Sequence, residues 1–347
     1  MKLTTQDKCC NNVGVLCNMN YRKFGTTDLL VSEIGFGAWA IGGAAKVGNT
    51  AIGWGDTDDA RSKEAVHAAI DAGINFFDTA DFYGLAHSEE LLGEALQGNK
   101  DVIVATKVGH RSIDDKIVLD YSREYILQAC EASLKRLKRD TIDYYQLHSA
   151  RVNHLEQGEC INAMEQLKKE GKIRYWGLSL NTFHPSPEAD YLMHENVGDG
   201  FQLVFNLINQ RALPTIKKAS AKGYGIIARM PLQFGLLTGK FSSQTTFAND
   251  DHRSFRLTAD ILENALAILE EKVRPVAKKE DINLVQLALS YILSYPEIST
   301  VIPGIRTEKH VKQNTAGLKT LADENRLFLE KLSHEWEPVV QLMEQKG

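Results

Sequence analysis

The sequence predicts a single-domain α/β protein that folds as a closed (β/α)₈ barrel. Eight short apolar runs alternate with longer amphipathic stretches between residues 33 and 304. Each run is apolar almost throughout, as a parallel strand buried on both faces requires. The chain has 347 residues, which suits one such barrel, and no linker rich in Pro, Gly or Ser divides it. A doubly wound open sheet with the same alternation is the alternative fold.

The strands are predicted from the β-branched and apolar content of these runs. In chain order they cover residues 33–38, 75–80, 102–107, 143–148, 175–180, 201–206, 225–230 and 299–304. Ahead of the first strand, two shorter runs flank the turn Gly25-Thr26-Thr27-Asp28. This pattern predicts an N-terminal β-hairpin over residues 21–32 that closes the floor of the barrel.

The helical stretches carry start and stop signals. Behind Ser122, a residue type that caps helix N-termini, apolar side chains recur at spacings of three and four: Leu127, Cys130, Leu134 and Leu137. Gly73 and Gly171 stand where helices are expected to stop. The first helix after the first strand is expected near Asp58, behind Thr57.

Composition excludes several classes of protein. A net charge of -5 without a dense Lys/Arg stripe argues against nucleic-acid binding. No apolar run is long enough for a signal peptide or a membrane span. The odd count of 5 cysteines, without paired spacing, predicts reduced thiols, no metal site and a cytoplasmic location. Residues 1–18 lack periodicity and are expected to be a disordered extension, or to precede a working chain that begins at Met19.

Polar residues that end the apolar runs are the candidates for chemistry, because a barrel of this kind builds its site at the C-terminal ends of its strands. Asp78, Lys107 and His148 each end a predicted strand, and Tyr83 follows five residues after Asp78. We therefore expect an acid, an ammonium, an imidazole and a phenol to share one mouth. Each of these residues taken singly has an ordinary structural explanation, and only their shared position favours a catalytic role.

This set suits the protonation of an alkoxide. A free tyrosine has a pKa of about 10, and a nearby ammonium such as that of Lys107 favours the phenolate. Asp78 would hold Lys107 charged, and His148 would position a carbonyl oxygen near the Tyr83 hydroxyl. An alkoxide forms when hydride reaches a carbonyl carbon, so the missing partner is a hydride donor such as a nicotinamide.

These residues and their surroundings resemble the aldo-keto reductases, NADPH-dependent oxidoreductases with a (β/α)₈ barrel. The resemblance extends from about residue 20 to about residue 320. The stretch 78–84, followed by Ser88 and Glu89, is similar to the family signature, and Lys107 and His148 fall where its other catalytic residues belong. The resemblance thus implies a catalytic tetrad of Asp78, Tyr83, Lys107 and His148.

The resemblance also implies a cofactor site. Ser179, Asn181 and Gln202 would bind the nicotinamide amide, and short polar groups after apolar strands suit that task. The turn that would bind the pyrophosphate contributes Pro231, Leu232, Gly235, Leu237, Gly239 and Lys240. The adenine and 2'-phosphate site would contain Gly304, Arg306, His310, Gln313 and Asn314, and Gly37 completes the set. Because the fork of donors on Arg306 suits a 2'-phosphate, NADPH is expected in preference to NADH.

The sequence departs from the family at several positions. Arg229 stands where many relatives stack an aromatic residue on the nicotinamide, and its guanidinium is expected to stack instead. His310 replaces a further basic residue, Ala86 replaces a glycine, and Ser149-Ala150-Arg151 lacks a common acidic residue. These departures concern substrate choice and cofactor selectivity more than the chemistry.

Three further residues lie on loops after the first two strands, namely Trp39, Trp54 and His87. They are expected to line a substrate pocket, with simple packing as the alternative. The stretch 35–40 also fits the G-x-G-x-x-A dinucleotide fingerprint, with Asp56 about twenty residues later. That motif requires a helix to start inside it, and the glycine-rich stretch 41–55 has no helical period. We therefore reject the Rossmann interpretation.

The sequence therefore predicts a reductase that converts an aldehyde or ketone to the alcohol, reversibly, with Tyr83 as general acid. A nicotinamide-sensing partner subunit, similar to the potassium-channel β subunits of this family, is the first alternative. A barrel enzyme that uses a metal or a phosphate substrate without nicotinamide is the second. The expected partner is a small carbonyl or alcohol substrate, and the sequence does not define the oligomeric state.

Overall fold

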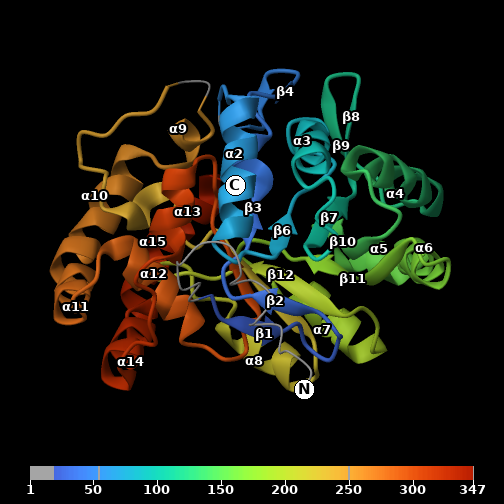
Figure 1. Cartoon of the computed structure of the whole chain (residues 1–347). Helices are drawn as coiled ribbons and strands as arrows, with labels where there is room; N and C mark the ends of the chain where they lie inside the picture. Colours follow the sequence, from blue (N-terminus) through green and yellow to red (C-terminus); the bar gives the residue numbers. More distant parts are fainter. Residues whose placement is uncertain (1–18, 54, 249–250, 347) are drawn as a thin grey trace, which may run out of the picture.

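The computed structural model describes residues 19–53, 55–248 and 251–346. Eight parallel strands form one sheet in the order β14-β13-β12-β11-β10-β7-β6-β3, with helices around it (Figure 1). The sheet contains β3 (Phe36–Gly37), β6 (Phe76–Asp78), β7 (Ile103–Val108), β10 (Ile142–His148), β11 (Ile173–Ser179), β12 (Gly200–Val204), β13 (Gly225–Arg229) and β14 (Thr300–Ile302). All eight predicted strands are confirmed, although the first, second and eighth are shorter than expected.

The sheet closes on itself between its first and last strands. Parallel bridges join Ile34 to Val301 and Gly37 to Gly304. A Cβ on Gly37 would lie 2.8 Å from the Pro303 carbonyl oxygen, so only glycine allows this close approach. The closed barrel excludes the open doubly wound sheet and its dinucleotide crevice.

An antiparallel hairpin closes the floor of the barrel, as predicted. Strands β1 (Tyr21–Lys23) and β2 (Leu30–Ser32) pair, and Phe24 at the start of their turn enters the barrel. Its ring meets Tyr144 edge to face at 4.8 Å. A Cβ on Gly200 or Gly225 would come within 2.7 Å of the Phe24 ring, so both strands depend on glycine to admit it. The hairpin therefore fills the end of the barrel opposite the catalytic mouth.

Apolar side chains of the helices pack into the core around the sheet. The N-cap of α2 is Asp58, whose side chain accepts from the Ala60 and Arg61 amides, so this helix begins one residue later than Asp58. Ser122 caps α4 as predicted, accepting from the Tyr125 amide. The helices are α2 (Asp59–Asp71), α3 (His87–Ala95), α4 (Arg123–Leu137), α5 (Val152–Gln157), α6 (Glu159–Lys169), α7 (Ser186–Glu195), α8 (Leu213–Ala221), α9 (Arg253–Arg256), α10 (Ala259–Ile268), α11 (Arg274–Lys279), α12 (Leu284–Leu293), α13 (Glu308–Thr315), α14 (Asp323–Lys331) and α15 (Ser333–Lys346). A π-helical turn, η3 (Leu269–Val273), joins α10 to α11.

Two small hairpins project at the opposite end of the molecule from β1 and β2 (Figure 1). They are β4 (Lys46–Val47) with β5 (Thr50–Ala51), and β8 (His110–Ile113) with β9 (Lys116–Leu119). After β3 the chain forms only a short 3-10 turn, η1 (Ala38–Ile41), and no long helix. This confirms the rejection of the Rossmann interpretation. The predicted extension, residues 1–18, lies outside the described residues.

Across the described ranges, the structure contains no helix with both the length and the apolar character needed to cross a bilayer.

Candidate active site

The pleat of the strands aims a ring of polar side chains at the mouth of the barrel. Strand residues two apart share a face, and Ile103, Ala105, Tyr144 and Ile227 belong to the core inside the barrel. The next inward-facing residue is therefore Lys107 on β7 and Arg229 on β13. On β10 it is Gln146, followed by His148. The sequence could locate strand ends, and the closed sheet makes these ends converge.

Lys107 is the centre of the predicted tetrad. Its Nζ donates to Asp78 Oδ2 at 2.6 Å, to the Thr79 carbonyl at 2.8 Å and to the Tyr83 hydroxyl at 3.1 Å. Lys107 is 0% exposed and Asp78 is 2% exposed. Lys107 thus links three of the four predicted catalytic residues, through its direct hydrogen bonds to Asp78 and Tyr83.

Opposing effects act on the ammonium of Lys107. Burial by itself lowers the pKa of Lys107, but the charge and hydrogen bond of Asp78, together with Tyr83, act the other way, and the net pKa is raised. Lys107 therefore remains protonated in neutral solution, with its charge directed at the Tyr83 oxygen.

Two buried glutamines complete the surroundings of Asp78, and Gln146 among them was not predicted. Gln202 Nε2 donates to Asp78 Oδ1 at 2.7 Å and to Gln146 Oε1 at 3.1 Å, while Gln146 Nε2 donates to the same Asp78 oxygen at 3.1 Å. The available signal was its spacing, because Gln146 lies two residues before His148 and shares its face. Gln202 thus connects the predicted amide-binding site with the tetrad.

His148 lies at the mouth with a second imidazole against it. Its ring stacks on His110 at 4.2 Å with 14° between the planes, and Tyr83 approaches edge-on at 5.9 Å. Burial, with contributions from His110, Lys107 and Arg229, lowers the pKa of His148 well below its usual value. His148 is therefore neutral at pH 7 and can donate one hydrogen bond to a substrate oxygen. Sequence reasoning did not single out His110, which follows the third barrel strand.

A chain of aromatic side chains from separate loops extends outward from Tyr83. The Trp39 ring lies 6.2 Å from Tyr83 and 5.0 Å from His252, and His252 in turn lies 5.3 Å from Phe234. The Trp39 indole donates to the Ile52 carbonyl at 3.0 Å. Trp39 thus lies beside Tyr83, and its role in a substrate pocket stays a prediction.

The other two predicted pocket residues differ from Trp39. His87 begins α3 and contacts Asp59 at 2.9 Å, with its side chain 37% exposed. Trp54 lies outside the described residues. His252 and Phe234 were not predicted, because they come from the long segment after β13, which has no sequence signal for a pocket.

The predicted amide-binding residues occupy neighbouring strand ends. Ser179 pairs in register with both His148 and Gln202. Asn181 Oδ1 accepts from the Phe183 and His184 amides, which fixes the turn after β11. Ser179 and Gln202 are buried at 2% and 1% exposure. These polar groups come together at one side of the mouth.

The predicted pyrophosphate turn has an unusual backbone. The residues Met230, Gln233, Phe234, Gly235 and Gly239 all have positive φ, and a 3-10 segment, η2 (Gln233–Thr238), runs through the turn. Successive left-handed residues present amide groups to one side, which favours anions. Pro231 and Leu237 are buried, Leu232 is partly buried, and Lys240 is exposed.

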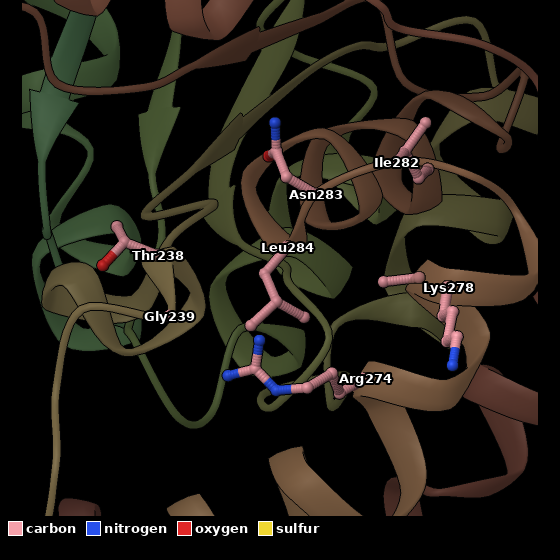
Figure 2. A pocket seen from close by; sticks show the side chains of 8 residues that line it. Thr238, Gly239, Arg274, Lys278, Ile282, Asn283 and Leu284 are labelled. Carbon is pink, nitrogen blue, oxygen red and sulfur yellow. The ribbon is translucent and has the colours of Figure 1, made fainter.

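A cavity of about 260 Å³ adjoins this turn (Figure 2). Thr238 and Gly239 line one side of it, and residues of α11 and the start of α12 line the other. A Cβ on Gly239 would lie 3.8 Å from Arg274 Nη2. Two cations line this wall, Arg274 and Lys278. Arg274 is paired with Glu270 at 2.6 Å.

The predicted adenine and 2'-phosphate residues lie on the loop after β14 and on α13. Burial lowers the pKa of His310, and the cations Arg306, Lys240 and Lys309 lower it further, which shows that these charges gather in one place. Asn314 is buried at 3% exposure, and its Nδ2 has no partner in the part of the chain that is described. Gly304 and Gln313 are exposed. A buried donor without an acceptor and a cluster of cations suit a ligand that carries a phosphate and hydrogen-bond acceptors.

Comparison with known proteins agrees with this architecture. The Aldo/keto reductase family profile matches residues 33–327. The chain is 32% identical over 311 residues to the uncharacterized oxidoreductase YqkF of Bacillus subtilis (strain 168), covering 88% of this chain and 94% of that one. It is also 32% identical over 324 residues to L-galactose dehydrogenase of Arabidopsis thaliana, covering 88% and 90%. Among solved structures, the holo form of aldo-keto reductase AKR11C1 from Bacillus halodurans is similar, with a TM-score of 0.73, 30% identity and coverage of 91% and 96%.

Two other relatives bear on cofactor and role. A probable voltage-gated potassium channel subunit beta of Oryza sativa subsp. japonica is 27% identical, covering 87% of this chain and 92% of that one. The NADH-specific methylglyoxal reductase of Escherichia coli (strain K12) is 28% identical, covering 89% and 97%. The profile match covers most of the barrel, and the fold agrees with it. The chain therefore belongs to the aldo/keto reductase family and is a nicotinamide-dependent oxidoreductase that acts on carbonyl compounds and alcohols.

Proposed function

We propose that this protein reduces an aldehyde or ketone with NADPH, reversibly, and that Tyr83 is the general acid. The observation that supports this most directly is the Lys107 Nζ contact with the Tyr83 hydroxyl at 3.1 Å, while Asp78 holds the same ammonium at 2.6 Å. The ammonium is thus placed to stabilise the negative charge that remains on the phenol oxygen when its proton passes to a developing alkoxide.

Each member of the tetrad has a separate task. A bound nicotinamide supplies the hydride. His148, held neutral against His110, donates a hydrogen bond to the substrate oxygen and places it near Tyr83. Tyr83 gives its proton to that oxygen as charge develops there. Asp78 keeps Lys107 charged and fixed, with the help of Gln146 and Gln202.

The preference for NADPH is proposed from the cations near His310. Arg306, Lys240 and Lys309 act together on that imidazole, and a 2'-phosphate would neutralise part of their mutual repulsion. Asn314 Nδ2, a buried donor, is available to the adenine side of the ligand. One relative is an NADH-specific reductase. Separate titrations of the protein with NADPH and with NADH test this preference.

The substrate pocket is proposed to include Trp39 and the neighbouring His252 and Phe234. The Trp39 ring lies beside Tyr83, His252 packs on Trp39, and Phe234 packs on His252. His87, which is paired with Asp59, and Trp54 complete the set as predictions from the sequence. A pocket with these walls favours a small carbonyl compound with an apolar face.

The test is the rate of NADPH consumption with an activated aldehyde or a quinone. Tyr83→Phe is expected to reduce kcat at least about 100-fold, because general acid catalysis contributes that much or more. The affinity for NADPH should change little, because the hydroxyl serves the reaction and not the cofactor. Tyr191→Phe, in α7 away from the mouth, is the matched control and should keep the wild-type rate. A Tyr83→Phe variant with undiminished kcat would remove Tyr83 from the proposed role.

A nicotinamide-sensing partner subunit is the second candidate, and the likeness to a channel β subunit favours it. Such a protein would bind NADPH tightly and reduce activated carbonyls very slowly. Wild-type protein that binds NADPH but turns over none of several aldehydes and quinones would support the sensor. A clear wild-type rate that is lost with Tyr83→Phe would support the reductase.

A further inference from the structure

Arg229 brings a positive charge to the mouth of the barrel without an acidic partner. Its guanidinium donates to the Leu180 carbonyl at 3.2 Å, to Thr182 Oγ1 at 3.1 Å and to Met230 Sδ at 3.2 Å, all of them neutral. Its Nε is buried and has no hydrogen-bond partner, and within residues 19–53, 55–248 and 251–346 Arg229 forms no ion pair. The charge of Asp78 acts on Arg229, but the Asp78 carboxylate is already paired with Lys107 at 2.6 Å.

The position of Arg229 ties this charge to the predicted nicotinamide site. Leu180, which accepts from Arg229, lies between Ser179 and Asn181, two of the predicted amide-binding residues. On the neighbouring strand, Arg229 pairs in register with Val204, two residues after Gln202. The guanidinium therefore stands against the segment that would hold the nicotinamide ring.

The other ionisable groups of the mouth do not cancel this charge. Asp78 and Lys107 compensate each other. His148 and His110 are neutral at pH 7, since burial lowers the pKa of both. Among the groups of the mouth that the structure describes, Arg229 therefore contributes a positive charge that these residues do not offset.

We propose that Arg229 makes the site prefer the neutral, reduced nicotinamide over the cationic, oxidised one, and so adapts the enzyme to the oxidation of alcohols. This inference rests on the proposed function. In that direction the hydroxyl proton of the alcohol passes to the Tyr83 oxygen, and a hydride with its two electrons passes from the carbinol carbon to C4 of the oxidised nicotinamide. The alcohol becomes a carbonyl compound and the cofactor is reduced.

The positive charge of Arg229 assists the hydride step of this reaction. It opposes the positive charge of the oxidised ring, which the hydride removes. The overall equilibrium in solution is unaffected, because no catalyst changes it. The effect must instead be visible in the relative affinities for the two forms of the cofactor.

The test is to titrate the protein separately with NADPH and NADP⁺ and follow quenching of tryptophan fluorescence. Wild-type protein should bind NADPH more tightly than NADP⁺. In Arg229→Met the ratio of Kd for NADP⁺ to Kd for NADPH should fall about tenfold, the order expected when one unit charge is removed from beside the ring. Arg229→Lys, which keeps the charge, should keep most of the wild-type ratio.

Several outcomes would overturn the inference. Equal affinities for the two forms in wild-type protein would do so without any variant. An unchanged ratio in Arg229→Met would assign Arg229 to packing or to the binding of a substrate anion. A raised KM for a carboxylate-bearing carbonyl compound, but not for a neutral one, would identify the anion-binding role. If Arg229→Met does not fold, Arg229→Gln retains a donor for Leu180 and Thr182 and serves the same purpose. Failure of both forms to bind would instead contradict the proposed function.

Discussion

Lys107 Nζ lies 2.6 Å from Asp78 Oδ2, and the two side chains are 0% and 3% exposed. The pair connects strands β7 and β6 inside the barrel, at the level where the apolar core ends and the mouth begins. A buried charge is tolerated when it is paired and hydrogen-bonded, and each of these two residues provides that for the other. The pair is therefore a requirement of the fold as well as of the proposed chemistry.

Asp78→Asn should reduce stability and activity together. The substitution leaves the Lys107 ammonium buried without an anion, which is expected to lower the free energy of unfolding by about 3–5 kcal/mol. Urea denaturation followed by circular dichroism measures this. The double variant Asp78→Asn/Lys107→Met should lose less than the sum of the two single losses, because no buried charge remains unpaired. Strictly additive losses would contradict the coupling.

Gln146→Leu tests the residue that the sequence did not indicate. It removes one donor from Asp78 and one acceptor from Gln202, so the proposed acid should be less well positioned. We expect kcat to fall about tenfold, the size of one charge-assisted hydrogen bond, with less than about a threefold change in Kd for NADPH. Gln202→Leu should lower kcat and also weaken the binding of NADPH. A Gln146→Leu variant that loses stability without any change in kcat would limit Gln146 to a structural role.

His110 should make stability fall in mild acid. Burial lowers the pKa of His110 to about 4 from the ordinary 6.5. Between these values the unfolded chain binds more protons than the folded one, so this contribution is complete above the unfolded pKa and is lost as pH falls towards the folded one. Between about pH 7.5 and about pH 5.5, wild-type protein should lose about 1 kcal/mol more than His110→Phe.

Urea denaturation at the two pH values provides this measurement, and His194→Phe is the control. The His194 side chain is 86% exposed and should not change the dependence on pH. If His110→Phe loses as much stability as wild-type protein, the stacked pair with His148 is not what makes the fold sensitive to acid.

Phe24→Ala tests the plug in the barrel floor. Phe24 is 0% exposed and fills the space that Gly200 and Gly225 leave open, so truncation creates a cavity. We expect a loss of about 3–5 kcal/mol in the free energy of unfolding. Leu30→Ala on the same hairpin, where the side chain is 41% exposed, should change it by no more than about 0.5 kcal/mol. Similar losses in the two variants would mean that the hairpin does not fill the floor.

Arg306→Leu tests the cofactor preference. If Arg306 contacts the 2'-phosphate, Kd for NADPH should rise about tenfold, and Kd for NADH, which has no such phosphate, should stay within about twofold. Fluorescence titration with each cofactor measures both values. Lys312→Leu, on the exposed side of α13, should affect neither. Equal losses for the two cofactors would place Arg306 outside the phosphate site.

The eight strands could be predicted because their apolar runs are a local property of the chain. Asp78, Lys107 and His148 were found for the same reason, since each is the first polar residue after a run or ends it. The residues that sequence reasoning missed have no such marker. His110 lies just after a strand whose end had already been assigned to Lys107. His252 belongs to a long loop whose path depends on side chains from elsewhere in the fold, such as Trp39.

The sequence by itself determined the alternation of strands and helices, the helix caps and the identity of the residues at strand ends, because periodicity and capping depend on neighbours within a few residues. Only the tertiary structure decided which of these residues meet. Closing the sheet between Gly37 and Gly304 is what makes the strand ends converge. That closure places Gln146 and Gln202 on Asp78 and His110 on His148, and it sets Arg229 against the Leu180 carbonyl and Thr182. Contacts between residues up to 124 positions apart, such as Gln202 with Asp78, are fixed by the curvature of the barrel and not by any local pattern.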